Sequence, residues 1–234
     1  MKKTLLLVAV LFISVLLHAQ ATYEVGKIYE INGVKGLVYK VSANGRHGMM
    51  MSLNVCPKKE SIAVNGGTDL SDALAELCKD EENGMNNFKA VEAYIKEHNL
   101  SWDKFPVFAW AQKLGEGWYI PSRAEMKELV SCLYGVEFTN TVMVGQDKAI
   151  KDIQDALKSN GGDKIVYPMV CSTCSKHTNE KKGKSYYSRT GLLLQSSDVG
   201  GIIGAVQDAQ IDKVAVSAFT FSYKVPGVRA IKSF

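Results

Sequence analysis

The chain has 234 residues, with 28 Lys and Arg against 24 Asp and Glu, a formal net charge of +4 and five cysteines. So small a charge excess gives no electrostatic case for a nucleic-acid partner. Five cysteines in a chain of this length are too few to replace a hydrophobic core as the scaffold.

Residues 1–21 have the features of a cleavable secretory leader. Two lysines precede an apolar run from Leu5 to Leu17, and Ala19-Gln20-Ala21 supplies small residues at a cleavage site. The run is shorter than the about 20 apolar residues that cross a bilayer, so no stable membrane span is expected. We therefore predict an extracytoplasmic protein, whether secreted, periplasmic or at the cell surface, with residues 22–234 as the mature chain.

The mature chain opens with a predicted hairpin. Residues 36–41 and 47–53 are β-prone, and Asn44-Gly45 lies between them. Asn-Gly is the strongest short-range hairpin pattern, because tight hairpin turns need positive φ.

Helical patterns fill the middle of the chain. Apolar residues at helical spacing predict helices over about 69–78, 86–98, 106–114, 122–133 and 147–158. Pro106 suits a first helical turn, and Ser122 and Glu125 have the spacing of a capping box. Gly161 is expected to end the last of these helices.

Strand patterns return in the last third of the chain. They predict strands over about 164–170, 186–194, 214–223 and 228–234. The polar residues 175–185 are expected to form an exposed loop, and the most basic stretch, 176–189, is interpreted as solvated and not as an anion site. With no repeat or linker in the sequence, strands at both ends and helices between them predict one domain of the α+β class.

Residues Gly117-Trp118-Tyr119-Ile120-Pro121-Ser122-Arg123-Ala124-Glu125-Met126 resemble the Gly-Trp-x-Leu-Pro-(Thr/Ser)-x-x-Glu-Leu motif of bacterial secreted domains with a C-type lectin-like fold, of the Lcl C-terminal and major paralogous types. Further segments follow in the family's order, at 36–53, 108–115, 170–174 and 228–234. The chain departs from the family at Val170, Cys171 and Cys174, where Trp, Ser and Glu are usual, and in an unmatched insert at about 54–86.

The resemblance implies a C-type lectin-like fold over residues 22–234, with the N- and C-terminal strands paired and the helices between them. In that fold Trp118, Pro121, Ser122 and Glu125 are expected to belong to the scaffold. It also implies a non-catalytic binding module whose partner is a glycan or an extracellular or surface protein.

The loops between about 175 and 212 are the expected binding face. The candidate ligand-binding residues are Tyr186, Tyr187, Lys176, His177 and Arg189. For the two tyrosines, the favoured interpretation is that they simply alternate between the two sides of a half-buried strand. The tripeptides that hold calcium in sugar-binding members of this fold do not occur here, so no cofactor is expected.

Cys171-Ser172-Thr173-Cys174 is the sharpest local chemical motif. Disulfides or inert structural thiols are the favoured interpretation in an oxidising compartment. A zinc site completed by His177 and other cysteines, or a redox dithiol, are the alternatives. They lead to a rival function, an extracytoplasmic thiol or metal protein using Cys171 and Cys174. A structural surface or fimbria-associated subunit is a third possibility.

Overall fold

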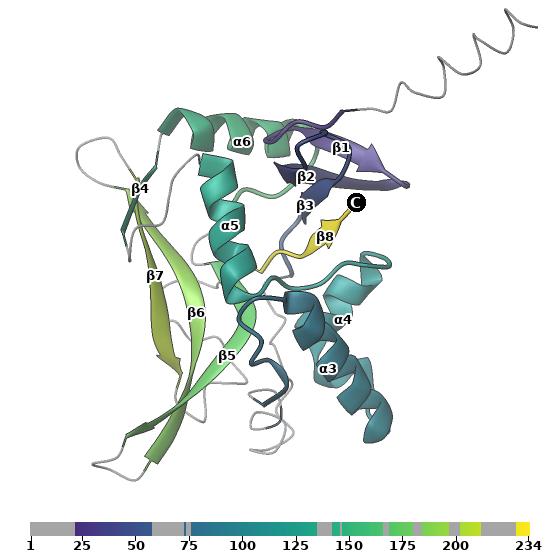
Figure 1. Cartoon of the computed structure of the whole chain (residues 1–234), viewed down its shortest axis with the longest axis vertical. Coiled ribbons are helices and arrows are strands. Elements are labelled where there is room, and N and C mark those ends of the chain that lie inside the picture. Colours follow the sequence, from purple (N-terminus) through teal and green to yellow (C-terminus); the bar gives the residue numbers. More distant parts are fainter. Residues whose placement is uncertain are drawn as a thin grey trace, which may run out of the picture.

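The computed structural model describes residues 22–57, 73, 76–134, 142–145, 147–165, 169–179, 184–196, 202–211 and 228–234. For 134, 142–145, 147–150, 169–170, 174–179, 184–196 and 202–211 the description covers the backbone alone. The expected leader, most of the 69–78 helix and the 214–223 strand lie outside these residues. Within them the chain is of mixed α and β structure, with two antiparallel sheets and the helices between (Figure 1).

Sheet A brings the first and the last of the described residues close together. Its strands, in spatial order, are β1 (Ile28–Ile31), β2 (Val34–Val41), β3 (Gly48–Ser52) and β8 (Ile231–Ser233). Strands β2 and β3 form the predicted hairpin, and Gly45 has a φ of 68° in their loop. The ring centroid of Tyr23, just before β1, lies 4.7 Å from that of Phe234, just after β8.

The partner of the last strand differs from the prediction. Strand β8 pairs with β3, the second arm of the hairpin, with Met50 opposite Lys232, and not with the first strand. On its other side, β8 forms an isolated β-bridge with Tyr119. Tyr119 and Ile231 exchange backbone hydrogen bonds of 3.0 and 2.8 Å. Both sides of β8 are therefore occupied by distant segments.

The helices agree closely with the local sequence patterns. They are α3 (Gly84–Glu97), α4 (Pro106–Lys113), α5 (Arg123–Tyr134) and α6 (Asp147–Ser159), with a short 3-10 helix, η1 (Trp102–Lys104), before α4. Pro106 is the first residue of α4. After α6, Gly162 N–H donates to Leu157 O and Gly161 N–H to Lys158 O, the Schellman arrangement that the glycines predicted.

Sheet B consists of β4 (Val142–Gly145), β7 (Ile202–Ile211), β6 (Lys184–Ser196) and β5 (Met169–Asn179), in that spatial order. The expected loop at 175–185 is wrong where the chain is described, because residues 175–179 extend β5 and 184–185 begin β6. The expected loop face at 175–212 likewise consists largely of paired strands. Their polar residues lack the apolar alternation that predicts a strand.

Helix α5 lies between the two sheets, in contact with β2 on one side and with β5 on the other (Figure 1). It buries the predicted apolar stripe of Met126, Leu129, Val130 and Leu133. A continuous core joins this stripe to sheet A and to α3 and α4, through large buried side chains such as Leu37, Met51, Phe105, Phe108 and Ile120.

Candidate functional site

The motif at 117–126 is a tightly held turn between α4 and α5. Trp118, Ile120 and Pro121 are buried, with Trp118 only 2% exposed. The turn begins with Gly117 at a φ of 81°, a conformation that side-chain-bearing residues rarely adopt. Its backbone continues into the bridge to the last strand described above. Trp118 and Pro121 therefore contribute packing and chain direction.

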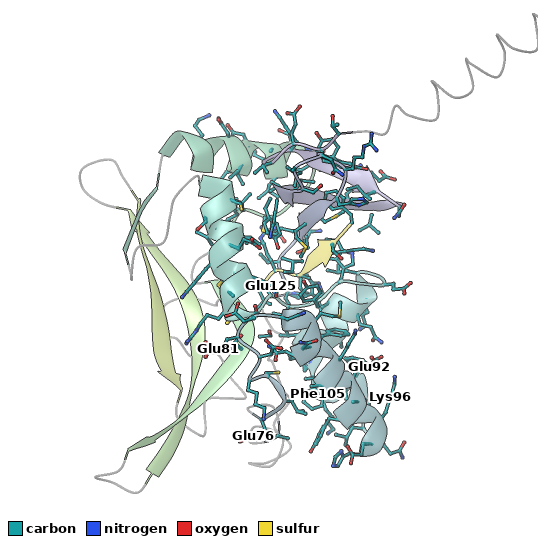
Figure 2. The ribbon with its side chains drawn as sticks, in the orientation of Figure 1. Glu76, Glu81, Glu92, Lys96, Phe105 and Glu125 are labelled. Carbon is teal, nitrogen blue, oxygen red and sulfur yellow. The ribbon has the colours of Figure 1, made fainter. Side chains whose placement is uncertain are left out.

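Glu125 connects this turn to two helices. Ser122 N–H donates to its Oε2 at 2.8 Å while Glu125 N–H donates to Ser122 Oγ at 3.2 Å, which is a complete capping box at the start of α5. The same Oε2 accepts from Gly84 N–H at 2.9 Å, at the start of α3, and Oε1 accepts from the Tyr119 hydroxyl at 2.7 Å. Figure 2 shows Glu125 where the starts of the two helices meet.

Gly84 permits this close approach. A Cβ at position 84 would lie against Ile120 O, 2.6 Å from Ser122 N and 2.9 Å from Glu125 Oε2. A side chain there would force α3 away from the turn. The negative carboxylate also complements the positive end of each helix dipole.

The two inner residues of the Cys-x-x-Cys motif continue the same polar network. Ser172 and Thr173 are 0% and 1% exposed. Ser172 N–H donates to Pro121 O at 2.8 Å, and Thr173 Oγ1 accepts from Arg123 N–H at 2.9 Å, in the first turn of α5. The fully buried Asn87 of α3 donates to Ser172 Oγ at 3.0 Å. The motif thus fastens β5 to both α3 and α5.

Asp80 completes the network before α3. Its carboxylate accepts from the backbone N–H groups of Glu82 and Asn83, at 2.9 and 2.8 Å, and from Asn86 Nδ2 at 2.7 Å. The Asn86 side chain, followed by the Asn83 N–H, lowers the pKa of the Asp80 carboxyl below its usual value. The backbone carbonyl of Asp80 accepts hydrogen bonds from Asn87 Nδ2 and from Thr173 Oγ1. Asp80 therefore fixes the approach to α3.

Two phenols and a thiol near this network have raised pKa values. Burial, aided by nearby Tyr119 and Glu125, raises the pKa of the Tyr39 hydroxyl well above its usual range. Burial and the hydrogen bond to Glu125 do the same to Tyr119. Burial and the Glu128 carboxylate raise the pKa of the Cys132 thiol. All three groups are held in their neutral forms.

The cysteines give little support to thiol chemistry. Cys171 is fully buried, and both Cys171 and Cys174 lie in strand β5 and not in the first turn of a helix, where a thiol pKa is lowered. Cys56 and Cys78 are also buried. In the described ranges no three His, Cys, Asp or Glu side chains are grouped so as to hold a metal ion. The side chains of Cys174 and His177 lie outside the described ones.

The five candidate ligand-binding residues come together on the ladder between β5 and β6. Lys176 stands opposite Tyr187 and His177 opposite Tyr186, while Arg189 stands opposite Cys174. In Figure 1 the end of the β5–β6 hairpin that carries them extends past the helices. Successive residues of a strand belong to opposite faces of a sheet. Lys176, Tyr187 and Arg189 therefore share one face, and His177 and Tyr186 share the other.

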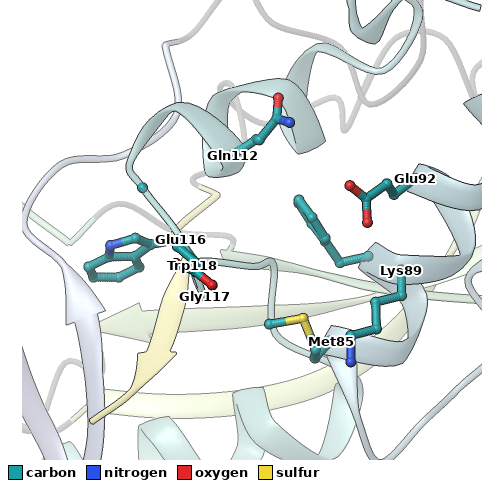
Figure 3. A pocket seen from close by; sticks show the side chains of 9 residues that line it. Met85, Lys89, Glu92, Gln112, Glu116, Gly117 and Trp118 are labelled. Carbon is teal, nitrogen blue, oxygen red and sulfur yellow. The ribbon is translucent and has the colours of Figure 1, made fainter.

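A groove on the body of the molecule was not predicted. It has a volume of about 430 Å³ and lies between α3 and the residues from Gln112 to Trp118 (Figure 3). Lys89 and Glu92 contribute to the α3 wall, and Glu116 to the opposite wall. Gly117 and Trp118 of the lining belong to the 117–126 motif, but the charged residues of the two walls are separated in the sequence, so only the folded arrangement reveals the groove.

Sequence patterns also missed the role of Arg229. This side chain is 2% exposed, and its guanidinium donates to four backbone carbonyls. Nη1 donates to Ser52 and Leu53, at 2.7 and 2.8 Å, and Nη2 to Asp163 and Lys164, at 2.7 and 3.1 Å. Arginine in an alternating strand segment gave no sign that its side chain would be buried.

None of the helices in the described part of the chain is both long and apolar enough to cross a membrane. No protein-family model, curated protein or solved structure was found to match this chain.

Proposed function

We propose that this protein is an exported, non-catalytic binding module of C-type lectin-like fold that recognises an acidic glycan. The leader-like residues 1–21 support export to an extracytoplasmic compartment. The order of the motif segments supports the fold, and the paired strands and helices of the described residues are compatible with it. The position of the partner-binding face rests on the β5–β6 ladder.

The observation that carries the binding proposal is the register of that ladder. It places Lys176 and Arg189 on the same face as Tyr187, at alternate positions along the two strands. An aromatic ring can pack against the apolar face of a sugar, and two neighbouring cations can pair with its carboxylate or sulfate groups. On the opposite face His177 stands opposite Tyr186, next to the pair of Ser175 and Ser188.

The first test is a glycan array probed with purified residues 22–234, with and without EDTA. We expect selective binding to acidic glycans that survives EDTA, because the calcium-holding tripeptides are absent from the sequence. Binding that is lost in EDTA would contradict the metal-free mode. Absence of all glycan binding would contradict the proposal and would direct attention to protein partners or assembly.

The two faces provide matched variants for the second test. Lys176→Met and Arg189→Met should each weaken glycan binding by about two- to fivefold, as expected for exposed ion pairs. Tyr187→Ala should weaken it by about fivefold or more. His177→Asn and Tyr186→Ala, on the other face, should leave the dissociation constant unchanged. Equal losses from both faces would contradict the assignment.

A further inference from the structure

The groove between α3 and residues 112–118 is shaped before any ligand arrives. Its α3 wall is fixed by the contacts of Gly84 and Asn87 with the motif turn and β5. On the other wall, Gly115 and Gly117 adopt φ values of 119° and 81°, and Lys232 Nζ donates to Glu116 O at 2.6 Å. A preformed site loses little conformational entropy on binding.

Opposite charges lie on the two walls. Lys89 is an exposed cation on α3, and Glu116 is an exposed anion on the turn (Figure 3). Within the described side chains, neither is part of an ion pair, whereas Glu92 is paired with Lys96 at 3.4 Å. One positive and one negative group are thus available to a ligand from opposite sides.

The space between the charges is lined by apolar side chains. Met85 is partly buried and flexible, so it can adjust to an apolar group of variable shape. Phe88 is only 9% exposed, because its ring packs against Trp102 and Phe108. A ring so covered offers no open face for stacking against a sugar. The groove therefore suits an apolar side chain better than a saccharide.

We propose that this groove binds a short zwitterionic peptide with an apolar side chain. The ammonium group of the peptide pairs with Glu116, its carboxylate pairs with Lys89, and its side chain lies against Met85 and the edge of Phe88. Gln112, on the same side as Glu116, can hydrogen-bond to the peptide backbone. This site is separate from the β5–β6 face, so peptide binding in the groove does not depend on glycan binding at that face.

The test uses calorimetry and amide NMR shifts on residues 22–234, with the dipeptide leucyl-leucine as the probe. We expect saturable binding, with shift changes gathered at residues 85–92 and 112–118. The same dipeptide with an acetylated N-terminus and an amidated C-terminus should bind about tenfold or more weakly, because it lacks both charges.

Charge-removing variants identify the two walls. Lys89→Met and Glu116→Gln should each raise the dissociation constant of leucyl-leucine by about three- to tenfold. Lys113→Met and Glu97→Gln alter exposed charges on α4 and α3 outside the groove, and should leave it unchanged. Because all four side chains are on or near the surface, the variants should fold normally, as circular dichroism would show.

Three results would overturn the proposal. They are equal affinity for the charged and the capped dipeptide, shift changes that fall outside the groove, and no binding by a protein whose folded state is verified. Failure of glycan binding on the array has no bearing on this outcome, since the two sites share no residue.

Discussion

At the scale of single residues, Glu125 joins three parts of the chain. Its carboxylate accepts hydrogen bonds at the starts of two helices and from Tyr119. The sequence predicted its capping role because Ser122 lies three residues away. The bond to Gly84 was not predictable, because it joins residues that are 41 positions apart in the chain.

Replacing Glu125 tests this arrangement. Glu125→Gln presents an NH₂ group to backbone donors and should lower the free energy of unfolding by about 1–3 kcal/mol. Glu128→Gln, one turn further along α5, breaks an exposed pair with Lys40 and should cost about 1 kcal/mol or less. Urea denaturation measures both. Equal losses would show that the buried bonds of Glu125 contribute no more than a surface ion pair.

Asp80 makes part of the stability dependent on pH. Its pKa is lowered in the folded chain below the ordinary value of 3.8, so its carboxylate stabilises the fold above about pH 4. That contribution is lost as the pH falls through the lowered folded value. Asp80→Asn should therefore reduce the acid-induced loss of stability, followed by urea denaturation at neutral and acid pH. Asp103→Asn, an exposed change in η1, is the matched surface variant for comparison.

At the scale of elements, local signals and long-range contacts differ in what sequence can predict. The starts of α4 and α5 and the end of α6 were predictable because Pro106, the Ser122–Glu125 pair and Gly161 act within one helical turn. The partner of β8 and the extent of β5 were not, since strand pairing depends on distant residues and polar strands resemble loops. Within the candidate site, only the motif turn was foreseen in detail.

Arg229 tests how elements are joined. Its side chain links the end of β3, the segment after α6 and the approach to β8. Arg229→Met removes the guanidinium bonds to four buried or partly buried carbonyls, of which Leu53 O keeps a bond from the Asp163 N–H. We expect a loss of about 3 kcal/mol or more in thermal or urea unfolding. Arg229→Lys should recover little, because an ammonium group cannot span two pairs of carbonyls. Lys232→Met, a change at a partly buried position that removes a bond to a single carbonyl, should cost much less.

At the scale of the whole molecule, the segment before β1 and the residue after β8 meet at sheet A. Tyr23 and Phe234 pack edge to face, and Phe234 exchanges backbone hydrogen bonds of 3.1 Å with Gly48. The core that these ends close includes residues from most of the described elements. Removing either ring should thus weaken the entire fold and not only one strand.

A double-mutant cycle measures this closure. Tyr23→Ala and Phe234→Ala should show a coupling energy of about 0.5–1.5 kcal/mol in urea unfolding, the range for aromatic pairs. Tyr23→Ala combined with Trp102→Ala, whose ring stacks on Phe88, should be additive within about 0.5 kcal/mol. Additivity of the Tyr23 and Phe234 changes would mean that the two ends contribute separately.

The anchoring of strand β5 affects how the protein responds to a pulling force. Its first half is anchored by Ser172 and Thr173 to the starts of α3 and α5, and its second half runs outward along the hairpin (Figure 1). A force applied to the outer end of the hairpin would be transmitted along the strand axis. It would act on the hydrogen bonds of Ser172 and Thr173 at the same time. Bonds that share a load break less readily than bonds peeled one at a time. A partner tethered at that end could therefore exert tension on the domain without first unzipping sheet B.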